Sequence, residues 1–464
     1  MKNINIKEIF KNKVTGNIII LITSILLIYL TISLYFINHF YVNTVINGVD
    51  VSLKTHKDVS DIIESYIKDY KLQLIERDEE IEEIEGQDIR LEYNEKNSVS
   101  KVYVMQNSFN WIRGLLNKEN YYIEDLFIYN KESLENKVKE LNCLNKDIIE
   151  PQNVSFKYSG GLYELVEEVL GNKINKDKLD EAIKNSILKG ERKLALNENL
   201  CYENPKYTLN SDKTIETKNI LNKHVSSKIT YIFGSEIEMI DGNRINQWLT
   251  VDDNLEVLIN QKLVKEYIEE LSEKYNTVGK TRNFKASTGK MVEVKGGYYG
   301  WKINIDSETK ELLENIKLGE TVEKEPKYTQ KALYREADDI GNTYVEINIT
   351  SQRMWFYKDG KLITQGSIVT GDPSKGHSTK LGTYMLNYKE KESTLRGANY
   401  EAKVNYWMPF NGNIGIHDAS WRYSFGGEIY KGDGTHGCVN SPLYLAKTIF
   451  ENIESGTPVI CYEE

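Results

Sequence analysis

Reactive side chains gather near the C-terminus of this 464-residue chain. Residues 417–440 contain two of the six histidines, His417 and His436, together with Asp418 and Cys438, which is one of only four cysteines. Several glycines between residues 426 and 434 predict a loop that folds back and brings His417 toward Cys438. A thiol is a good nucleophile only as thiolate, and a neighbouring imidazole can accept its proton near neutral pH. The pattern therefore predicts a Cys/His site for acyl transfer.

Two other interpretations fit the same residue types. A free cysteine is usually a small buried hydrophobe, and a lone histidine is more often structural than catalytic. A metal site is the second alternative, because His417, Asp418, His436 and Cys438 all have ligand chemistry. However, His436 and Cys438 are only two residues apart, and the sequence near them has neither a second cysteine nor a CxxC or HExxH spacing. We therefore expect no metal here.

The order of these residues carries a resemblance to a known family. Gly415-Ile416-His417-Asp418, followed by Thr435-His436-Gly437-Cys438-Val439-Asn440, resembles the signature of the L,D-transpeptidase (YkuD-like) family. That signature is a histidine, a spacer of this length, and then Ser/Thr-His-Gly-Cys-apolar-Asn. The resemblance extends from about Tyr344 to Tyr462. One departure is Thr379-Lys380-Leu381-Gly382, where the family usually has Thr-Pro-x-Gly.

The resemblance assigns roles that the residues alone leave open. Either His417 or His436 could serve Cys438 as a base, and the resemblance selects His417 as base and leaving-group acid. Asp418 stands where the family orients the imidazole through a backbone carbonyl or a side chain. Backbone amides of His436, Gly437 and Cys438 are expected to form an oxyanion hole, since Gly437 allows a close approach of the backbone.

Substrate contacts are expected around this loop. Tyr406 to Met408 resemble residues of the family's substrate cleft, although an aromatic pair is as often part of a core. Arg422 could bind a substrate carboxylate through two hydrogen bonds or form a structural ion pair. The full set of expected contacts is Tyr406, Trp407, Met408, Arg422, Thr435 and Asn440.

The activity that the resemblance implies is peptidoglycan L,D-transpeptidation without metal or organic cofactor. Cys438 would be acylated at the L-centre of the third residue of a tetrapeptide stem and would expel the terminal D-Ala. The amine of a neighbouring stem would then form a 3→3 cross-link, and carbapenem-type β-lactams are expected to acylate Cys438. The alternatives are an L,D-carboxypeptidase that uses water, an enzyme that attaches a protein amine to peptidoglycan, and an inactive, membrane-anchored wall-binding module.

Length and composition limit the remaining possibilities. A chain of 464 residues suggests about three domains. The net charge of −10 argues against a nucleic acid as partner. Four cysteines are too few for a disulfide scaffold, although Cys143 and Cys201 could pair outside the cell, and Cys461 is expected in a core.

An apolar segment near the N-terminus predicts the location. Residues 17–41 have no charged residue before His39, and as a helix this length spans about 30 Å of hydrocarbon. Basic residues precede the segment, at Lys2, Lys7, Lys11 and Lys13. The positive-inside rule then gives a retained single-pass anchor, with residues 1–16 in the cytoplasm and the rest outside at the cell wall.

The predicted fold is multidomain. Residues 42–205 and 206–335 are expected to be α+β, with helices beginning after Thr55 and Asn175 and one over 261–275, and with a polar linker over 324–339. The sequences Ile46 to Val51 and Gly296 to Trp301 resemble parts of domains named for peptidoglycan binding, and a spacer above the membrane is the alternative. Residues 336–464 are expected to be mainly β, a mixed sheet or sandwich that starts with a strand at Tyr344 and a hairpin at Asp359-Gly360.

Overall fold

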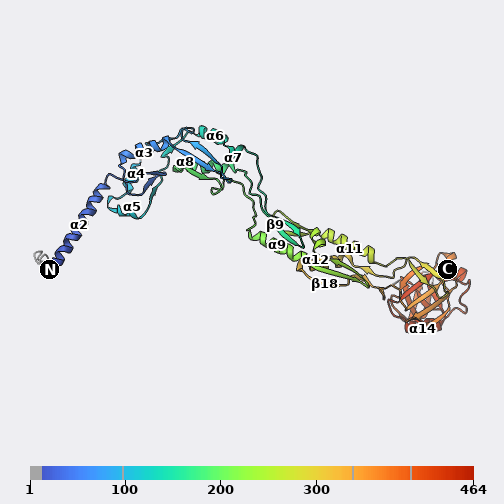
Figure 1. The fold of residues 1–464 in the computed structure, drawn as a ribbon. Coiled ribbons are helices and arrows are strands. Elements are labelled where there is room, and N and C mark those ends of the chain that lie inside the picture. The colour runs from blue at the N-terminus through green and yellow to red at the C-terminus, as the bar shows by residue number, and fades with distance from the viewer. Residues whose placement is uncertain (1–12, 97–98, 337–338, 398–399) are drawn as a thin grey trace. The chain divides into compact units, whose positions relative to one another are not determined.

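The computed structural model describes residues 13–96, 99–336, 339–397 and 400–464, coloured along the chain in Figure 1. These residues form two compact units. Among the described residues, those of 13–155 and 166–211 belong to the first unit, and those of 156–165 and 212–464 belong to the second. The region expected to form the first α+β domain, residues 42–205, thus contributes one hairpin to the second unit, from strands β8 (Ser155–Ser159) and β9 (Leu162–Val166).

The first unit begins with helix α2 (Lys13–Tyr35). Of the helices in the described part of the chain, only α2 is long and apolar enough to cross a membrane. Its apolar side chains are exposed, for example Ile18 at 49% and Leu27 at 60%. The helix starts earlier than the apolar run and ends at Tyr35 rather than Tyr41.

The rest of the first unit packs short sheets against helices. Strands β1 (Thr44–Ile46) and β2 (Val49–Asp50) form a hairpin with its turn at Asn47-Gly48, and β1 also pairs in parallel with β6 (Glu119–Tyr121). A second sheet has the order β10-β3-β4, and its strand β4 contains three glutamates. Its strands and the main helices are β3 (Lys71–Ile75), β4 (Ile81–Glu85), β10 (Lys193–Ala195), α3 (His56–Lys68) and α8 (Lys176–Lys189).

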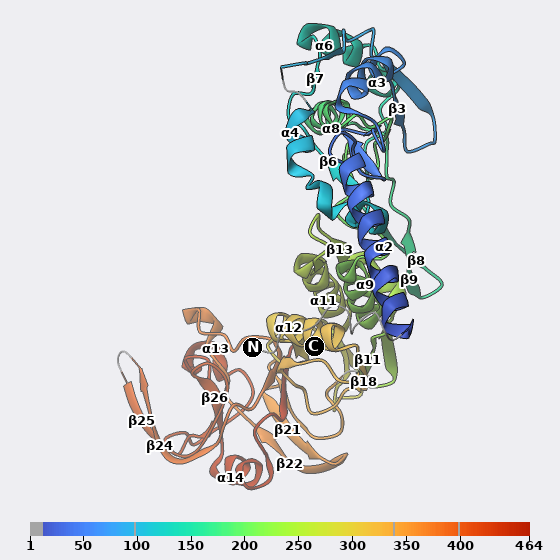
Figure 2. The ribbon, with the colours of Figure 1, turned by 90° about the vertical axis from the view of Figure 1, so that its left-hand side faces the viewer.

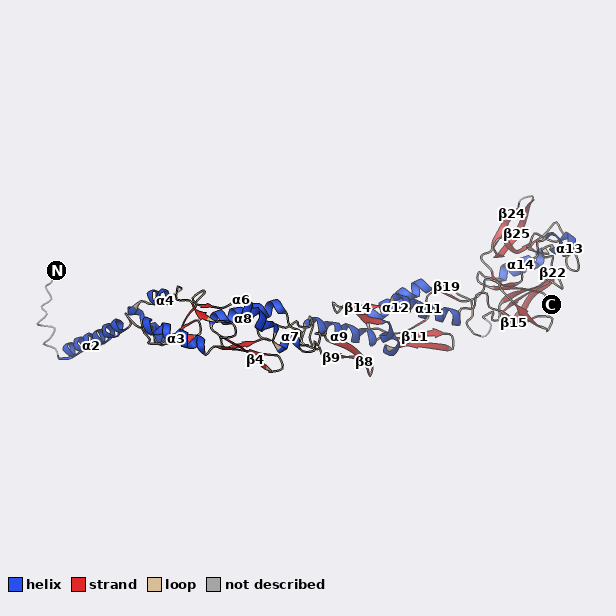
Figure 3. Cartoon of the chain, turned by 90° about the horizontal axis from the view of Figure 1, so that it is seen from above, coloured by secondary structure: helices blue, strands red, loops and turns tan. Residues whose placement is uncertain are grey.

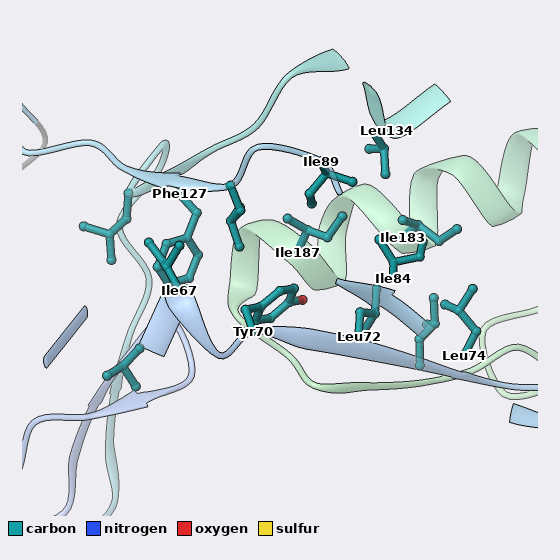
Figure 4. Close-up of a cluster of buried hydrophobic side chains, with 14 of the residues drawn as sticks. Ile67, Tyr70, Leu72, Leu74, Ile84, Ile89, Phe127, Leu134, Ile183 and Ile187 are labelled. Carbon is teal, nitrogen blue, oxygen red and sulfur yellow. The ribbon is translucent and has the colours of Figure 1, made fainter. Parts of the chain in front are cut away.

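Caps and core explain why these helices form where they do. The Thr55 hydroxyl accepts from the N–H of Asp58 at the start of α3, and Gly190 ends α8 in the left-handed conformation. Figure 4 shows Ile183 and Ile187 of α8 over Tyr70 and Leu72 of the sheet region. Cys143 and Cys201 are both buried in this unit as free thiols, so the disulfide left open above is not formed. The smaller elements are β5 (Glu92–Tyr93), α4 (Ser100–Met105), η1 (Ser108–Asn110), α5 (Ile112–Leu116), β7 (Phe127–Ile128), α6 (Lys131–Lys139) and α7 (Asn142–Asn145).

The second unit starts with an α+β region around a three-stranded sheet of order β12-β11-β18. Buried aromatic and aliphatic residues from the sheet and helices form its core, among them Tyr231, Ile268 and Leu312. The predicted helix over 261–275 is present as α11. The elements are α9 (Asp212–Val225), β11 (Lys228–Phe233), β12 (Glu236–Ile240), α10 (Gly242–Ile245), η2 (Asn246–Trp248), β13 (Leu249–Val251), β14 (Val257–Ile259), α11 (Gln261–Tyr275), α12 (Ile305–Leu318) and β18 (Thr321–Lys324).

The C-terminal region is mainly β, as predicted. One sheet has the order β22-β21-β20-β28-β23 and the other has the order β24-β25-β26-β27. Helix α14 (Leu443–Asn452) packs its apolar face into the core beside β22 and β26. The strands are β20 (Tyr344–Asn348), β21 (Arg353–Lys358), β22 (Lys361–Ser367), β23 (Gly382–Met385), β24 (Glu390–Gly397), β25 (Tyr400–Asn411), β26 (Ile414–Asp418), β27 (Val439–Ser441) and β28 (Pro458–Tyr462). Two short helical turns, η3 (Pro373–Lys375) and α13 (Tyr430–Asp433), lie in its loops. Figures 2 and 3 show β24 and β25 extending away from the rest of this region.

A hairpin of the preceding region covers the C-terminal sheet. It consists of β15 (Arg282–Lys285) and β16 (Met291–Val294), and the Phe284 ring contacts the rings of Tyr344 and Tyr462 at 5.4 and 6.0 Å between centroids. The N–H and hydroxyl of Ser287 donate to the Glu346 carboxylate at 2.9 and 2.5 Å. Glu346 and Asn348 of β20 are fully buried, because the hairpin and Tyr462 cover them.

The segment expected to be a linker is also packed. Its strand β19 (Tyr328–Gln330) pairs with β17 (Lys302–Ile303), and the Trp301 indole N–H donates to the carbonyl of Tyr334. Asp339 is 2% exposed and lies 2.7 Å from the buried Arg282 guanidinium. Buried polar groups of this kind need their partners, so residues 324–336 and Asp339 act as part of the core and not as a free connection.

Removing the Phe284 ring should therefore destabilise the second unit. A buried Phe→Ala change costs about 3 to 5 kcal/mol because it removes transfer energy and leaves a cavity. Phe284→Ala should lower the midpoint of urea unfolding, followed by circular dichroism. Lys285→Ala, at an exposed position of the same strand, is the matched control and should stay near the wild-type midpoint. Equal midpoints for the two variants would show that the hairpin is not docked in solution.

Candidate active site

Strand pairing brings His417 and Cys438 to the same cavity. Strand β26 runs parallel to β27 with Ile416 opposite Val439 and His417 opposite Asn440, so Cys438 directly precedes the paired segment. Both side chains line a cavity of about 480 Å³. The loop between the strands therefore returns the cysteine to the histidine, as the glycine-rich spacing predicted. Cys438 is half-buried, and its thiol lies 3.6 Å from the carbonyl oxygen of Asn413.

The His417 ring is held by a backbone hydrogen bond and two indoles. Its Nδ1 is 2.9 Å from the carbonyl oxygen of Asp418. A carbonyl can only accept, so we assign the proton to Nδ1, and Nε2 keeps the lone pair that could receive a proton. The rings of Trp407 and Trp421 lie 5.8 and 5.9 Å from the imidazole, which is only 3% exposed.

Burial sets the protonation states of the pair. It lowers the pKa of His417 below the usual histidine value, and the hydrogen bond to the Asp418 backbone opposes this only in part. Burial raises the pKa of the Cys438 thiol, and a hydrogen bond from the Gly415 backbone opposes that shift in part. A neutral thiol beside a neutral imidazole is the resting state that both shifts favour. Such a pair can transfer the thiol proton when the sulfur attacks an acyl group.

The Asp418 carboxylate points away from the imidazole. It accepts from the N–H groups of Asn405 and Tyr406 at 2.9 and 2.8 Å and from the Asn405 side-chain amide at 2.7 Å. With 1% exposure and three donors, it ties β25 to the end of β26. Of the two possibilities left open by the sequence, the carbonyl of Asp418 is the group in contact with His417.

The turn before Cys438 is fixed by two threonine hydroxyls. Thr435 Oγ1 donates to the Cys438 carbonyl at 2.6 Å and accepts from the Gly437 N–H at 3.0 Å. Thr379 Oγ1 donates to the Gly437 carbonyl at 2.7 Å. Gly437 has a φ of +116°, which favours glycine, and a Cβ there would come within 3.1 Å of Ile414. Of the three expected oxyanion donors, the Gly437 amide is thus already engaged.

Other expected contacts have mixed positions. Arg422 and Asn440 line the cavity, but the Arg422 guanidinium donates to the Asp433 carboxylate and carbonyl at 3.0 and 2.7 Å, which is the structural ion pair named as its alternative. Asn440 exchanges two backbone hydrogen bonds with Val369, both of 2.9 Å. The Tyr406 ring packs on Phe450, 5.1 Å away between centroids.

Met408 does not fit the expected substrate role. It is fully buried in the core of the C-terminal region, because it faces the opposite side of β25 from Trp407. A side chain with no exposed surface cannot contact a peptide, so Met408 is a packing residue.

Sequence reasoning missed several residues of the cavity. Trp421 is 46% exposed beside the His417 ring, and the ribbon of β24 and β25 contributes Leu395, Glu401, Ala402 and Lys403 to the lining. The His377 ring lies 4.5 Å from the ring of His436. An exposed tryptophan three residues after Asp418 was a possible signal, but the ribbon residues become neighbours of the loop only through strand pairing.

The Asp418 carboxylate should matter for stability whatever the reaction. Asp418→Ala leaves the N–H groups of Asn405 and Tyr406 without their acceptor, and each unsatisfied group costs about 1 to 3 kcal/mol. We expect a loss of about 2 to 5 kcal/mol in the free energy of unfolding in urea. Asp433→Ala is the matched control, because the Asp433 carboxylate is 84% exposed in its ion pair with Arg422, and its removal should cost at most about 1 kcal/mol. Similar losses for both variants would contradict a structural role of the Asp418 clamp.

Comparisons with known proteins agree with this geometry. Residues 342–461 match the model of the L,D-transpeptidase catalytic domain (YkuD), and residues 82–195 and 207–323 match a model described as "Putative peptidoglycan binding domain". A comparison with curated proteins found no match.

Solved structures of L,D-transpeptidases are similar to parts of the chain. The Ldtfm–avibactam carbamoyl enzyme is 35% identical, with a TM-score of 0.46, over 54% of this chain and 99% of the other. A Cys-to-Ser mutant of Enterococcus faecium L,D-transpeptidase is 35% identical, with a TM-score of 0.45, over 53% of this chain and 100% of the other. The catalytic domain from E. faecium L,D-transpeptidase acylated by ertapenem is 41% identical, with a TM-score of 0.25, over 26% of this chain and 97% of the other. The chain belongs to the L,D-transpeptidase family, with a YkuD catalytic domain at its C-terminal end and two peptidoglycan-binding-domain segments before it.

Proposed function

We propose that this protein forms 3→3 cross-links in peptidoglycan through an acyl-enzyme on Cys438. The observation that carries the proposal is the pair of Cys438 and His417 in one cavity, with the His417 Nδ1 proton bound by the Asp418 carbonyl. That arrangement leaves Nε2 as the acceptor for the thiol proton. Membership in the family supplies the reaction class.

The proposed reaction has two acyl transfers. His417 Nε2 takes the thiol proton as Cys438 Sγ attacks the carbonyl at the L-centre of the third residue of a tetrapeptide stem. Backbone N–H groups of His436 and Cys438 stabilise the oxyanion, and His417 returns the proton to the amine of the leaving D-Ala. The side-chain amine of a second stem then attacks the thioester, loses its proton to His417 and restores the thiol.

The cavity supports a peptide as substrate. Leu395, Ala402 and Trp421 provide apolar surface, and Glu401 and Lys403 add one charge of each sign on the β24–β25 ribbon. We assign Trp407, Thr435 and Asn440 to positioning the pair and the loop, and Trp421 and Arg422 to the wall that a stem peptide would contact.

The remaining segments fit the same role. We propose α2 as a single-pass anchor with its preceding residues in the cytoplasm, so that the catalytic domain acts outside at the wall. Residues 42–205 and 206–335 would be two wall-binding regions, and residues 336–464 the catalytic domain, with the hairpin of residues 155–166 and the β15–β16 hairpin crossing these nominal borders.

Product analysis with the full-length protein tests the function. The protein in detergent or nanodiscs is mixed with a disaccharide-tetrapeptide, and the muropeptides are separated and identified by mass spectrometry. Dimers linked between two diamino acids, absent with Cys438→Ala, are the expected result. Tripeptide alone would identify an L,D-carboxypeptidase, and retention on isolated walls with no product would favour an inactive binding module.

Carbapenem acylation gives a direct test of the nucleophile. The catalytic domain of E. faecium L,D-transpeptidase was solved acylated by ertapenem, and we expect the same drug to add once to this protein at Cys438. Intact mass should rise by one drug equivalent in the wild type and in Cys461→Ala, whose thiol is fully buried, but not in Cys438→Ala. An adduct that persists in Cys438→Ala would exclude Cys438 as the acylated group.

The pH dependence should report on His417. Because only the neutral imidazole can accept the thiol proton, kcat/KM should fall as pH decreases through the pKa of His417. Burial lowers that pKa, so the midpoint should lie below the ordinary value of about 6.5, and activity should be level from about pH 7 to 8. His436→Gln should keep this profile and His417→Gln should lose activity at every pH. A profile that is preserved in His417→Gln and lost in His436→Gln would assign the base to His436.

A further inference from the structure

An unusually apolar surface lies in the first unit, far in sequence from the catalytic residues. It consists of six large side chains in α4, η1 and α5 that are between 45% and 82% exposed: Val104, Met105, Phe109, Ile112, Leu115 and Leu116. We call this set the 104–116 patch. Clustered exposed apolar residues on a folded domain indicate an interaction surface.

Helix α8 of the same unit shows the contrast. Each of its exposed positions is polar, and its apolar residues Leu179, Ile183 and Ile187 are fully buried. The 100–116 segment also has an inner apolar face, because Val102 is 3% exposed and the Tyr103 ring packs on Phe40. The segment therefore has a second apolar face, on its outer side, in addition to the one that packs in the core. Water does not favour such an exposed apolar face.

Contacts with α2 show what surrounds this patch. The Trp111 ring stacks on Phe36 at 6.0 Å and lies 6.0 Å from the Tyr29 ring. The Tyr29 hydroxyl donates to the carbonyl of Phe109, and Figure 1 shows α4 and α5 beside the C-terminal end of α2. The 104–116 segment thus packs against the C-terminal half of α2, and on the side of α2 away from this contact Leu34 is 64% exposed.

The level of these contacts along α2 corresponds to the outer edge of a bilayer. With 1.5 Å per residue, Tyr29 lies about 24 Å and Phe36 about 34 Å from Lys13 along the axis. If Lys13 marks the inner boundary, a hydrocarbon layer of about 30 Å ends between these two aromatic residues. Trp111, which touches both, then lies at the interface, where tryptophan and tyrosine are enriched. Basic side chains border the patch at Lys101 and Lys118, which are both exposed, whereas the exposed Arg113 beside them pairs with the Glu119 carboxylate at 2.8 Å.

We propose that residues 104–116 are a second membrane contact that inserts its apolar side chains into the outer leaflet beside α2. The proposal rests on the proposed anchor role of α2. The lipid acyl chains and headgroups are the partner, because the patch shares its surroundings with α2 and carries cationic residues that match anionic headgroups. Such a contact fixes the first unit at the membrane surface through α2 and the 104–116 patch together.

Spin labels on the full-length protein in vesicles can test this insertion. The vesicles are phosphatidylcholine with phosphatidylglycerol, and the protein carries Cys438→Ala, since Cys143, Cys201 and Cys461 are buried. Nitroxides are placed singly at Leu116→Cys, at Ile148→Cys and at Leu26→Cys. Ile148 is the matched control, because it is also apolar, lies in the same unit and is 64% exposed, and Leu26 on α2 reports on the anchor itself.

Power saturation with oxygen and with a water-soluble nickel chelate separates the outcomes. We expect labels at positions 116 and 26 to collide readily with oxygen and several-fold less with nickel than the label at position 148. Equal nickel collisions at 116 and 148, with position 26 in lipid, would overturn the insertion and leave the anchor intact. Low collisions with both reagents at 116 would replace lipid by a protein partner such as a second copy. Nickel access at position 26 would overturn the anchor and the insertion together.

Discussion

The parallel pairing of β26 with β27 is the constraint on which the chemistry of this protein depends. It fixes which residues face each other across the two strands and so returns Cys438 to His417 after a loop of some twenty residues. Hydrogen bonds from neighbouring segments stabilise that pairing. Thr435 and Thr379 hold the turn in front of Cys438, Val369 holds Asn440 behind it, and the Asp418 carboxylate ties β26 to β25.

Burial then determines the state in which the pair waits. A dry environment disfavours both the thiolate and the imidazolium, so the pKa of Cys438 rises and that of His417 falls. The proposed nucleophile would therefore be neutral until an acyl group approaches. A thiol kept neutral is also less open to oxidation than a thiolate.

The segment directly before the catalytic domain is packed against it. The β15–β16 hairpin covers Glu346 and Asn348 of the C-terminal sheet. The buried ion pair between Arg282 of β15 and Asp339 ties this hairpin to the end of the segment expected to be a linker. A buried ion pair with additional hydrogen bonds holds one geometry, since separating it would expose two unpaired charges to a poorly solvating interior. The second peptidoglycan-binding segment and the catalytic domain are thereby joined through a packed contact.

The sequence by itself determined what depends on local pattern. The ordered residues from Gly415 to Asn440 indicated the family, the Thr55 and Asn175 caps located helices, Asp359-Gly360 located a hairpin, and the apolar run identified α2. These features succeed because each is decided by neighbours within a few residues, or by a motif whose residues are strict in type and order.

Only the tertiary structure decided which side of each residue meets which partner. It turned the Asp418 carboxylate toward β25 and its carbonyl toward His417, buried Met408, paired Arg422 with Asp433, and brought Trp421 and the β24–β25 ribbon to the cavity. It also packed the polar segment after Lys324 against Arg282 and Trp301. Hydrogen-bond direction and burial depend on segments that are distant in the sequence, so no local pattern carries that information.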